Sequence, residues 1–351
     1  MSILNPSSVK RLVIRTPNWV GDAVMSTPFV RSVRKNFPQA HIALLAKPWV
    51  APVYENNPHV DDMIIYDAAG RHSGFFGKFW LARDLRRYHF DLALLLQNAF
   101  EAAFIKWMAG IGMRLGFDTD GRKMLLTHPI HRYPFLKHRH QIDYYLEILQ
   151  GAGLFAKPAD MEIVLSDTEK IRAIQYLTDT GCPIDACVIG INPGAAFGTA
   201  KRWFENRFAE VCNRLKSIPN ACFMIFGSPG EEAIGHRIAG AVGEACINLC
   251  GKTTLREAIA LIDQCRLFIT NDSGLMHVAA ALNIPQIAIF GPTNHTTTSP
   301  RSPVSQILRI PVACSPCMKP DCPIDHRCMD AVTVDHVLEL AYHLLSEERP
   351  A

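Results

Sequence analysis

The stretch TNDSGLMHVAAAL (270–282) is the most informative part of the chain. A short apolar run, residues 267–270, leads into it, and residues 275–282 are rich in the strong helix formers Leu, Met and Ala. The pattern predicts a strand-to-helix turn in which Asp272 or Ser273 is the N-cap and Gly274 permits close approach of another group. The N–H groups and the positive end of the helix dipole then point outward, which suits a bound anion.

Short apolar runs alternate with helical stretches on both sides of this turn. We expect strands at residues 12–14, 42–45, 63–66, 92–96, 187–191, 221–226, 247–249, 267–270 and 286–290. Helical patterns lie at residues 23–36, 81–87, 203–216, 231–242, 255–263, 275–282 and 334–347. Such alternation predicts parallel strands covered by helices, and so an α/β fold class.

The length of 351 residues is more than one core usually serves, so two domains are expected. We predict domains at 1–165 and 166–332, followed by a C-terminal helix at 333–351 that packs back toward the first domain. The sequence shows no secretory signal and no apolar run long enough to span a bilayer, and 48% of its residues are hydrophobic. These features predict a globular cytoplasmic protein.

The charge is unevenly distributed along the chain. Residues 1–165 carry 20 Lys and Arg against 14 Asp and Glu, whereas residues 166–351 carry 16 against 19. Within the basic half, the segment 121–141 holds Arg122, Lys123, Arg132, Lys137, Arg139 and four histidines, with no acid. Two interpretations stay open for it: a solvated loop, or a docking surface for a phosphorylated or otherwise anionic partner.

Four of the eleven cysteines are bunched in CSPCMKPDCPIDHRC, namely Cys314, Cys317, Cys322 and Cys328. They could supply thiolates to zinc or an iron–sulfur cluster, or remain reduced thiols in a Pro-rich loop. The other seven stand in apolar surroundings and are expected to behave as small core residues: Cys182, Cys187, Cys212, Cys222, Cys246, Cys250 and Cys265.

Three further loops that follow predicted strands carry candidate chemistry. In RTPNWVGDAVMSTP (15–28), Gly21 permits a tight approach and Asp22 is either an N-cap or a general base. In NPGAAFGTAKRW (192–203), small residues leave backbone N–H groups open to an oxyanion, and Lys201 adds a charge suited to phosphate. In FGSPGEEAIG (226–235), Glu231 could accept from ribose hydroxyls.

Several motifs of other enzymes are absent from the sequence. There is no G-x-G-x-x-G after a strand, which argues against a dinucleotide oxidoreductase. CGKTTL (250–255) lacks the earlier glycine of a P-loop, and no G-x-S-x-G elbow occurs.

Together, NWVGDAVMSTP, NPGAAFGTAKRW, FGSPGEE, CGKTTL, TNDSGLMHVAAAL and IAIFGPT (287–293) resemble the lipopolysaccharide heptosyltransferases of glycosyltransferase family 9, above all those that add the second heptose. These pieces span nearly the whole chain in the family's order. The resemblance implies a GT-B fold of two Rossmann-like doubly wound parallel-sheet domains facing a central cleft. It further implies ADP-heptose as donor, heptosylated Kdo2-lipid A as acceptor, peripheral contact with the cytoplasmic face of the inner membrane, and no nucleic-acid partner.

The resemblance also assigns roles residue by residue. Asp22 matches the catalytic base, with Gly21 beside it, and Lys201 matches the pyrophosphate-binding lysine. Ala195 and Ala196 lie in the phosphate-facing loop, and Glu231 matches the ribose-binding acid. Thr253 and Thr254 lie near the segment that contacts adenine. The diphosphate and the heptose are held by Asp272, Ser273, Gly274 and His277. Because like charges repel, we expect the Asp272 carboxylate to face heptose hydroxyls.

The implied reaction is an inverting transfer in which Asp22 takes the acceptor proton while Lys201 and helix N-termini stabilise the departing ADP. No divalent metal and no cofactor are then strictly required. Two alternatives stay open: a first-heptose or other nucleotide-sugar transferase of the same architecture, and a metal-binding interaction module built around the cysteine cluster.

Overall fold

The computed structural model describes residues 4–183 and 185–347, and the chain divides into two compact units, Met1–Val164 and Leu165–Ala351. Each unit contains one six-stranded sheet in which the strands pair in parallel. None of the helices in the described part of the chain is long and apolar enough to cross a membrane.

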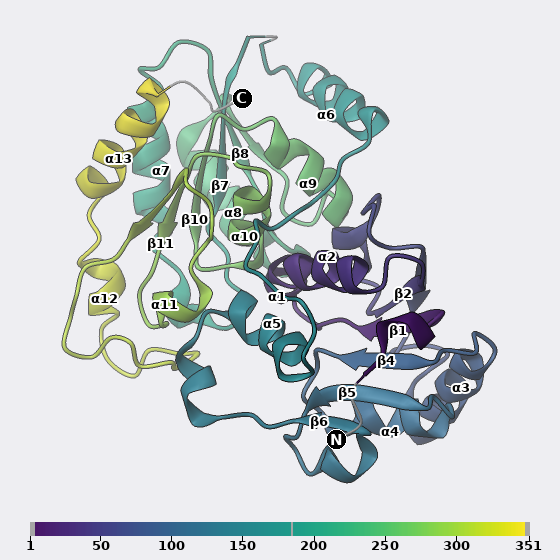
Figure 1. Ribbon diagram of the computed structural model, residues 1–351. Coiled ribbons are helices and arrows are strands. Elements are labelled where there is room, and N and C mark those ends of the chain that lie inside the picture. The colour runs from purple at the N-terminus through teal and green to yellow at the C-terminus, as the bar shows by residue number, and fades with distance from the viewer. Residues whose placement is uncertain (1–3, 184, 348–351) are drawn as a thin grey trace. The chain divides into compact units, whose positions relative to one another are not determined.

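The first unit has its helices on both faces of the sheet, with α3 and α4 on one face and α1, α2 and α5 on the other (Figure 1). Its strands are β1 (Arg11–Arg15), β2 (His41–Ala46), β3 (Asp62–Ile65), β4 (Leu92–Leu95), β5 (Met113–Phe117) and β6 (His128–Ile130). Its α-helices are α1 (Val20–Met25), α2 (Thr27–Asn36), α3 (Gly74–Arg86), α4 (Phe100–Met108) and α5 (Gln141–Gly151). Short 3-10 helices cover Pro6–Ser8, Ala51–Tyr54, Arg122–Leu125 and Pro134–His138.

The strand order of the first sheet is β3-β2-β1-β4-β5-β6. The apolar side chains of β1 and β4 are fully buried, as expected of strands covered on both faces. The order reverses between β1 and β4, which pair from Leu12 with Leu92 to Arg15 with Leu95. In doubly wound sheets, ligands bind beyond the carboxyl ends of the strands at such a reversal, and the loop that carries Asp22 leaves β1 there.

The helix predicted at residues 23–36 is wrong as a single element. Two helices, α1 and α2, meet at Ser26, whose hydroxyl donates to the carbonyl of Ala23 at 2.8 Å. Pro28 explains the break, because proline lacks the N–H that a continuous helix needs and is favoured in a first helical turn.

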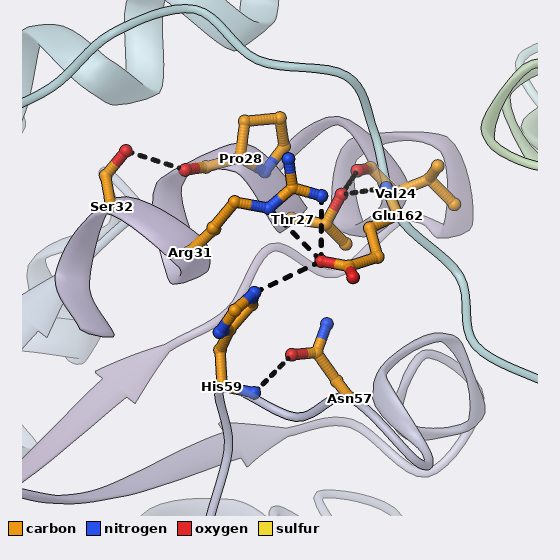
Figure 2. Close-up of polar contacts among 8 residues, drawn as sticks. All are labelled: Val24, Thr27, Pro28, Arg31, Ser32, Asn57, His59 and Glu162. Carbon is orange, nitrogen blue, oxygen red and sulfur yellow. Dashed lines mark hydrogen bonds and ion pairs between the residues drawn. The ribbon is translucent and has the colours of Figure 1, made fainter. Parts of the chain in front are cut away.

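The segment that leads out of the first unit is fixed to α2 through Glu162 (Figure 2). The Glu162 carboxylate accepts from Arg31 at 2.9 Å and lies 3.4 Å from the His59 ring nitrogen, while its backbone N–H donates to Thr27 Oγ1 at 2.9 Å. Burial lowers the pKa of His59, so Arg31 is the main counter-ion of Glu162 near neutral pH.

The second unit has α7, α8 and α13 packed into the core on one face of its sheet, and α9 and α10 contact each other and lie on the other face (Figure 1). Its strands are β7 (Cys187–Asn192), β8 (Ala221–Ile225), β9 (Cys246–Asn248), β10 (Leu267–Asn271), β11 (Gln286–Ile289) and β12 (Ser305–Leu308). Its α-helices are α6 (Asp167–Asp179), α7 (Glu205–Leu215), α8 (Glu232–Val242), α9 (Leu255–Asp263), α10 (Gly274–Ala281), α11 (His295–Thr298), α12 (Arg327–Asp330) and α13 (Val334–Ser346). Two 3-10 turns, Thr199–Lys201 and Pro229–Glu231, lie in loops that follow strands.

The second sheet runs β12-β11-β10-β7-β8-β9, which is the strand order of the first sheet read from the other edge. The reversal therefore lies between β7 and β10, the two strands that precede the 192–203 loop and the TNDSG turn. The prediction of two Rossmann-like doubly wound parallel-sheet domains is confirmed.

The C-terminal helix α13 is an integral part of the second unit. Its apolar face, Val334, Val337, Leu338, Ala341 and Leu344, lies in the same core cluster as α7 and α8. This helix was predicted to pack back toward the first domain; in the structure its apolar face is covered by the second sheet and α7.

Cys182 and Cys222 are buried, as expected of small core residues, but their sulfurs also form a disulfide, which was not predicted. It joins the segment before β7 to β8, two neighbouring parts of the second unit. The other nine cysteines are free thiols.

Candidate functional site

Two asparagines hold together the loops at the reversal point of the second sheet. Asn192, the last residue of β7, accepts from the Ser273 hydroxyl at 2.5 Å and donates to the carbonyl of Phe226 at 2.9 Å. Asn271, the last residue of β10, accepts from the N–H of Trp203 at 3.1 Å and donates to the carbonyl of Pro193 at 2.7 Å. Both side chains are buried, so these bonds fix the loops after β7, β8 and β10 relative to one another.

The half-buried Lys201 and the buried Asp272 form an ion pair within this group of loops. The Lys201 ammonium lies 2.6 Å from Asp272 Oδ2, and the same oxygen accepts from the Thr293 hydroxyl at 2.6 Å. The Phe197 ring lies 5.1 Å from the ammonium. Asp272 was expected to face heptose hydroxyls, but in the structure it neutralises the lysine instead. A phosphate group that binds Lys201 must therefore compete with Asp272.

The helix α10 begins as predicted, with Ser273 as its N-cap, but the Ser273 side chain makes no capping hydrogen bond. Its hydroxyl is directed to Asn192 instead. Gly274 is the first helical residue, and His277 is buried in the same helix. Because the N-cap side chain does not occupy the first turn, an anion can be accommodated at the positive end of this helix.

The phosphate-facing loop and the predicted ribose acid are in contact. Glu231 Oε2 accepts from the N–H and the hydroxyl of Ser228 at 2.7 and 2.8 Å, in a capping box that opens the 3-10 turn before α8. The other oxygen, Oε1, lies so close to Gly194 that a Cβ atom there would approach it to 1.9 Å. Next along the loop, Ala195 is buried and Ala196 is exposed. Glycine at 194 is therefore required for Glu231 to reach its position.

The CGKTTL loop packs on the loop that carries Glu231. The N–H of Gly251 donates to the carbonyl of Gly227 at 3.1 Å, and burial, assisted by the charge of Glu231, raises the pKa of the Cys250 thiol to about 12. Thr254 caps α9 in a capping box with Glu257, while Thr253 is half-buried. The loop that contains the two threonines thus contacts the loop of the predicted ribose-binding acid through Cys250 and Gly251, and Thr254 already has a structural role.

The cysteine-rich segment 314–328 is hydrogen-bonded to the loop that carries Lys201 and to the loop next to Thr293, the residue that contacts Asp272. The carbonyl of Pro320 accepts from the N–H of Ala200 at 2.9 Å, and the carboxylate of Asp321 accepts from the hydroxyl of Thr199 at 2.7 Å. The N–H of Cys317 donates to the carbonyl of Pro292 at 3.0 Å, next to Thr293. Over residues 4–183 and 185–347, no three His, Cys, Asp or Glu side chains are grouped so as to hold a metal ion.

In the first unit, Asp22 is the third residue of α1 rather than its N-cap, which is Trp19. Gly21, the preceding residue, is buried. The hydroxyl of Tyr145, on α5, donates to Asp22 Oδ1 at 3.1 Å. Burial, reinforced by the charge of Asp22, raises the pKa of Tyr145 well above its ordinary value, so the phenol stays protonated and remains a donor. The tyrosine therefore fixes the orientation of the carboxylate.

The basic segment 121–141 is only partly available as a docking surface. Arg122 is fully buried and donates to the carbonyls of Phe117 and Gln97. Including Arg122 in that surface is wrong, since its guanidinium satisfies backbone groups at the ends of β5 and β4. Arg139 is exposed and lies over the Phe135 ring at 5.5 Å.

The sequence predicted the loops of the candidate site but not the side chains that link them. Asn192, Asn271, Thr293 and Tyr145 were not among the predicted site residues. An asparagine directly after each of two neighbouring strands was the available signal for the first two. The other two contact their aspartates from remote positions, which a single sequence does not show.

Two doubly wound parallel-sheet units, with a lysine, two acids and the N-terminus of α10 near the reversal point of the second, are the architecture of GT-B glycosyltransferases. Comparison with known proteins narrows the class. The model of Glycosyltransferase family 9 (heptosyltransferase) matches residues 79–327, and the chain belongs to this family.

Relatives within the family extend over nearly the full chain. Lipopolysaccharide heptosyltransferase 2 of Salmonella typhimurium is 31% identical over 96% of this chain and 99% of the relative. The solved structure of E. coli ADP-heptose LPS heptosyltransferase II has a TM-score of 0.81 and 30% identity, covering 96% of this chain and 98% of that one. A family 9 glycosyl transferase from Veillonella parvula, 24% identical, has a TM-score of 0.87 over 98% and 99% of the two chains and shares the fold.

Proposed function

We propose that this glycosyltransferase moves L-glycero-D-manno-heptose from ADP-heptose onto the first heptose of Kdo2-lipid A, with inversion at the anomeric carbon. The observation that carries the proposal is the Lys201–Asp272 ion pair at the reversal point of the second sheet. The names of the relatives, which include an ADP-heptose LPS heptosyltransferase, support the choice of donor and acceptor.

The donor is held by the second unit. Lys201 exchanges its contact with Asp272 for the diphosphate, the first turn of α10 adds backbone N–H groups, and Glu231 accepts from the ribose. Asp272, once released, accepts from sugar hydroxyls. Lysine and helix-terminus charge stabilise the departing ADP, so no divalent metal and no cofactor are strictly required.

The acceptor hydroxyl is deprotonated by Asp22, which Tyr145 orients. General base catalysis by one positioned side chain contributes about 10²–10⁴-fold to rate. The acceptor phosphates bind the exposed Lys137 and Arg139 and the half-buried Arg132 of segment 121–141, because a basic segment attracts an anionic ligand. Since the acceptor is a lipid, the enzyme works at the cytoplasmic face of the inner membrane as a peripheral protein.

Transfer of radiolabelled heptose to mono-heptosylated Kdo2-lipid A tests the reaction. We expect the wild type to transfer and Asp22→Asn to lose about 10²–10⁴-fold in kcat while still binding ADP. Asp160→Asn, at an exposed carboxylate in the same unit, is the matched control and should keep full activity. Transfer only to an acceptor that lacks heptose, or from a different nucleotide sugar, would contradict the proposal.

The acceptor site has its own test. Replacing Arg132, Lys137 and Arg139 with Gln should raise the KM for the phosphorylated acceptor and leave the KM for ADP-heptose unchanged, because the donor binds in the other unit. Lys170→Gln, at an exposed lysine on α6 of the second unit, serves as the charge control. An unchanged acceptor KM in the triple variant would remove this segment from the proposal.

A further inference from the structure

The helix α3 exposes large aromatic side chains along the face opposite its core contacts. Leu81, Ala82 and Leu85 are buried against the sheet. On the other side, Phe75, Phe76, Phe79 and Trp80 are 64%, 77%, 44% and 49% exposed. A helix that is apolar on both faces normally has something covering each of them, so the outer face of α3 indicates a binding partner.

The neighbouring helix α4 enlarges this apolar face. Phe100 and Trp107 are 45% and 52% exposed, and both rings stack on Phe104, with centroids 5.9 Å apart in each pair. The two helices contact each other on the same side of the sheet (Figure 1). Between their C-terminal ends lies an open hollow of about 900 Å³, whose lining includes Phe79, Arg83, Arg86 and Trp107. We call the exposed aromatic residues of α3 and α4 the aromatic face.

Arginines lie beside the aromatic face and keep their positive charge. Arg83 lies over the Trp80 ring at 5.4 Å, Arg86 donates to the carbonyl of Met108 at 2.7 Å, and Arg87 is exposed. The nearby carboxylates already have closer cationic partners: Asp84 accepts from Arg71 at 2.8 Å, and Glu101 from Lys78 at 2.7 Å. The surface therefore combines apolar rings with a net positive edge.

We propose that the aromatic face inserts into the interfacial region of an anionic lipid bilayer. Phe and Trp rings bordered by arginine are the composition of helices that lie in the membrane interface, where rings enter the acyl boundary and cations contact lipid phosphates. The described helices are too short or too polar to span a bilayer, so contact along a helix side is the mode available to α3 and α4. A neutral apolar partner would leave the charge of Arg83 and Arg86 without a counterpart.

Co-sedimentation of the full chain with vesicles tests the proposal without donor or acceptor. We expect binding to vesicles that contain phosphatidylglycerol and much weaker binding to pure phosphatidylcholine vesicles. Phe76→Ser combined with Trp80→Ser should lower the partition coefficient at least about tenfold. Each of Arg83→Gln and Arg86→Gln should lower it about fivefold. Ile171→Ser with Ile174→Ser, at exposed apolar residues of α6, is the matched control and should bind like wild type.

Three outcomes would overturn the assignment. The aromatic variant could bind phosphatidylglycerol vesicles as tightly as wild type, or wild type could bind neither vesicle. Alternatively, the chain could form a dimer in solution that the aromatic variant loses, which would make the face a contact between copies. Circular dichroism and the melting temperature of the variant establish that it is folded. Because vesicle binding is measured without transfer, and transfer to a deacylated acceptor should be unchanged in the variant, failure here is distinguishable from failure of the proposed function.

Discussion

Single residues in the second unit determine how the loops of the proposed donor site pack against one another. Gly194 is needed because its missing side chain leaves room for Glu231, and Lys201 is held in place by Asp272 before any ligand arrives. The sequence pointed to these positions because small residues and a cation after a strand are typical of phosphate sites. It did not reveal that Asp272 is the partner of Lys201, since the two residues are far apart along the chain.

Gly194→Ala should weaken donor binding. The added methyl group would approach Glu231 Oε1 to 1.9 Å, so the carboxylate must leave its position, and losing a hydrogen bond to a charged group costs about 1.5–3 kcal/mol. We expect the Kd for ADP and the KM for ADP-heptose to rise at least about tenfold. Gly240→Ala, on α8 with nothing within 4 Å of the added Cβ, is the control and should leave both constants unchanged. Equal constants for Gly194→Ala and wild type would show that Glu231 does not contact the ribose.

A second residue-scale prediction concerns Lys106, which is fully buried on α4 and whose ammonium has no hydrogen-bond partner among the described residues. Burial holds its pKa well below the ordinary value of 10.5. The unfolded chain therefore binds a proton that the folded chain does not, and wild type loses stability as pH falls below 10.5 toward the folded pKa. Lys106→Met should abolish this loss, so its advantage in melting temperature over wild type should grow as pH is lowered from 10 to 8. A constant difference across that range would rule the explanation out.

At the scale of elements, strands with a continuous apolar sequence could be predicted, whereas strands with polar or half-exposed residues could not. The strands β1, β2, β4, β7 and β10 were predicted because their buried residues are continuous. In contrast, β5 contains Arg114, whose guanidinium donates to the carbonyls of Leu125 and Ile111, and β12 is a half-exposed edge strand. Neither sequence predicts a strand, because β5 and β12 are stabilised by tertiary contacts rather than by local sequence preference.

The helix α6 was not among the predicted helices and is held by an ion pair with α9. Arg256 donates to both oxygens of Glu169 at 2.6 and 2.7 Å and is the main cause that lowers the pKa of Glu169 to about 2. Because the folded pKa lies below the ordinary value of 4.5, this pair contributes stability above pH 4.5 that is lost as pH falls toward 2.

Glu169→Gln should therefore lower the melting temperature at neutral pH, and the gap to wild type should narrow as pH falls from 4.5. Glutamine can still serve the capping box at Ser166, so the variant isolates the charge. Glu244→Gln, at an exposed carboxylate of the same unit, is expected to match wild type at every pH. A gap of constant size from neutral to acid pH would show that the pair with Arg256 does not set this stability.

At the scale of the whole molecule, the two units share one strand order but differ in what they gather at the reversal point. The first presents an aspartate oriented by a buried tyrosine, and the second presents a lysine, small residues and helix N-termini. The two-domain fold could be predicted from alternating patterns alone. The membership of α13 in the second core could not, because an amphipathic helix does not specify which sheet it covers.

Hydrogen exchange of the full chain with and without ADP should separate the two units. We expect the strongest protection at residues 192–203, 226–235, 250–255, 270–277 and 291–293, because these loops contain the proposed donor contacts. Exchange in α1 and α5 should change less. Protection concentrated in residues 1–164 would place the nucleotide in the wrong unit for our proposal.

The position of α13 has a consequence for how the chain folds during its translation. Residues 1–164 form a contiguous unit, so this part can acquire its fold on the ribosome while the rest is still being translated. The second core, in contrast, includes side chains from α13, which are synthesised after all six strands of its sheet. A stalled or prematurely terminated nascent chain would therefore contain a folded first unit and an incomplete second core, so the proposed donor site would be the last part of the protein to form.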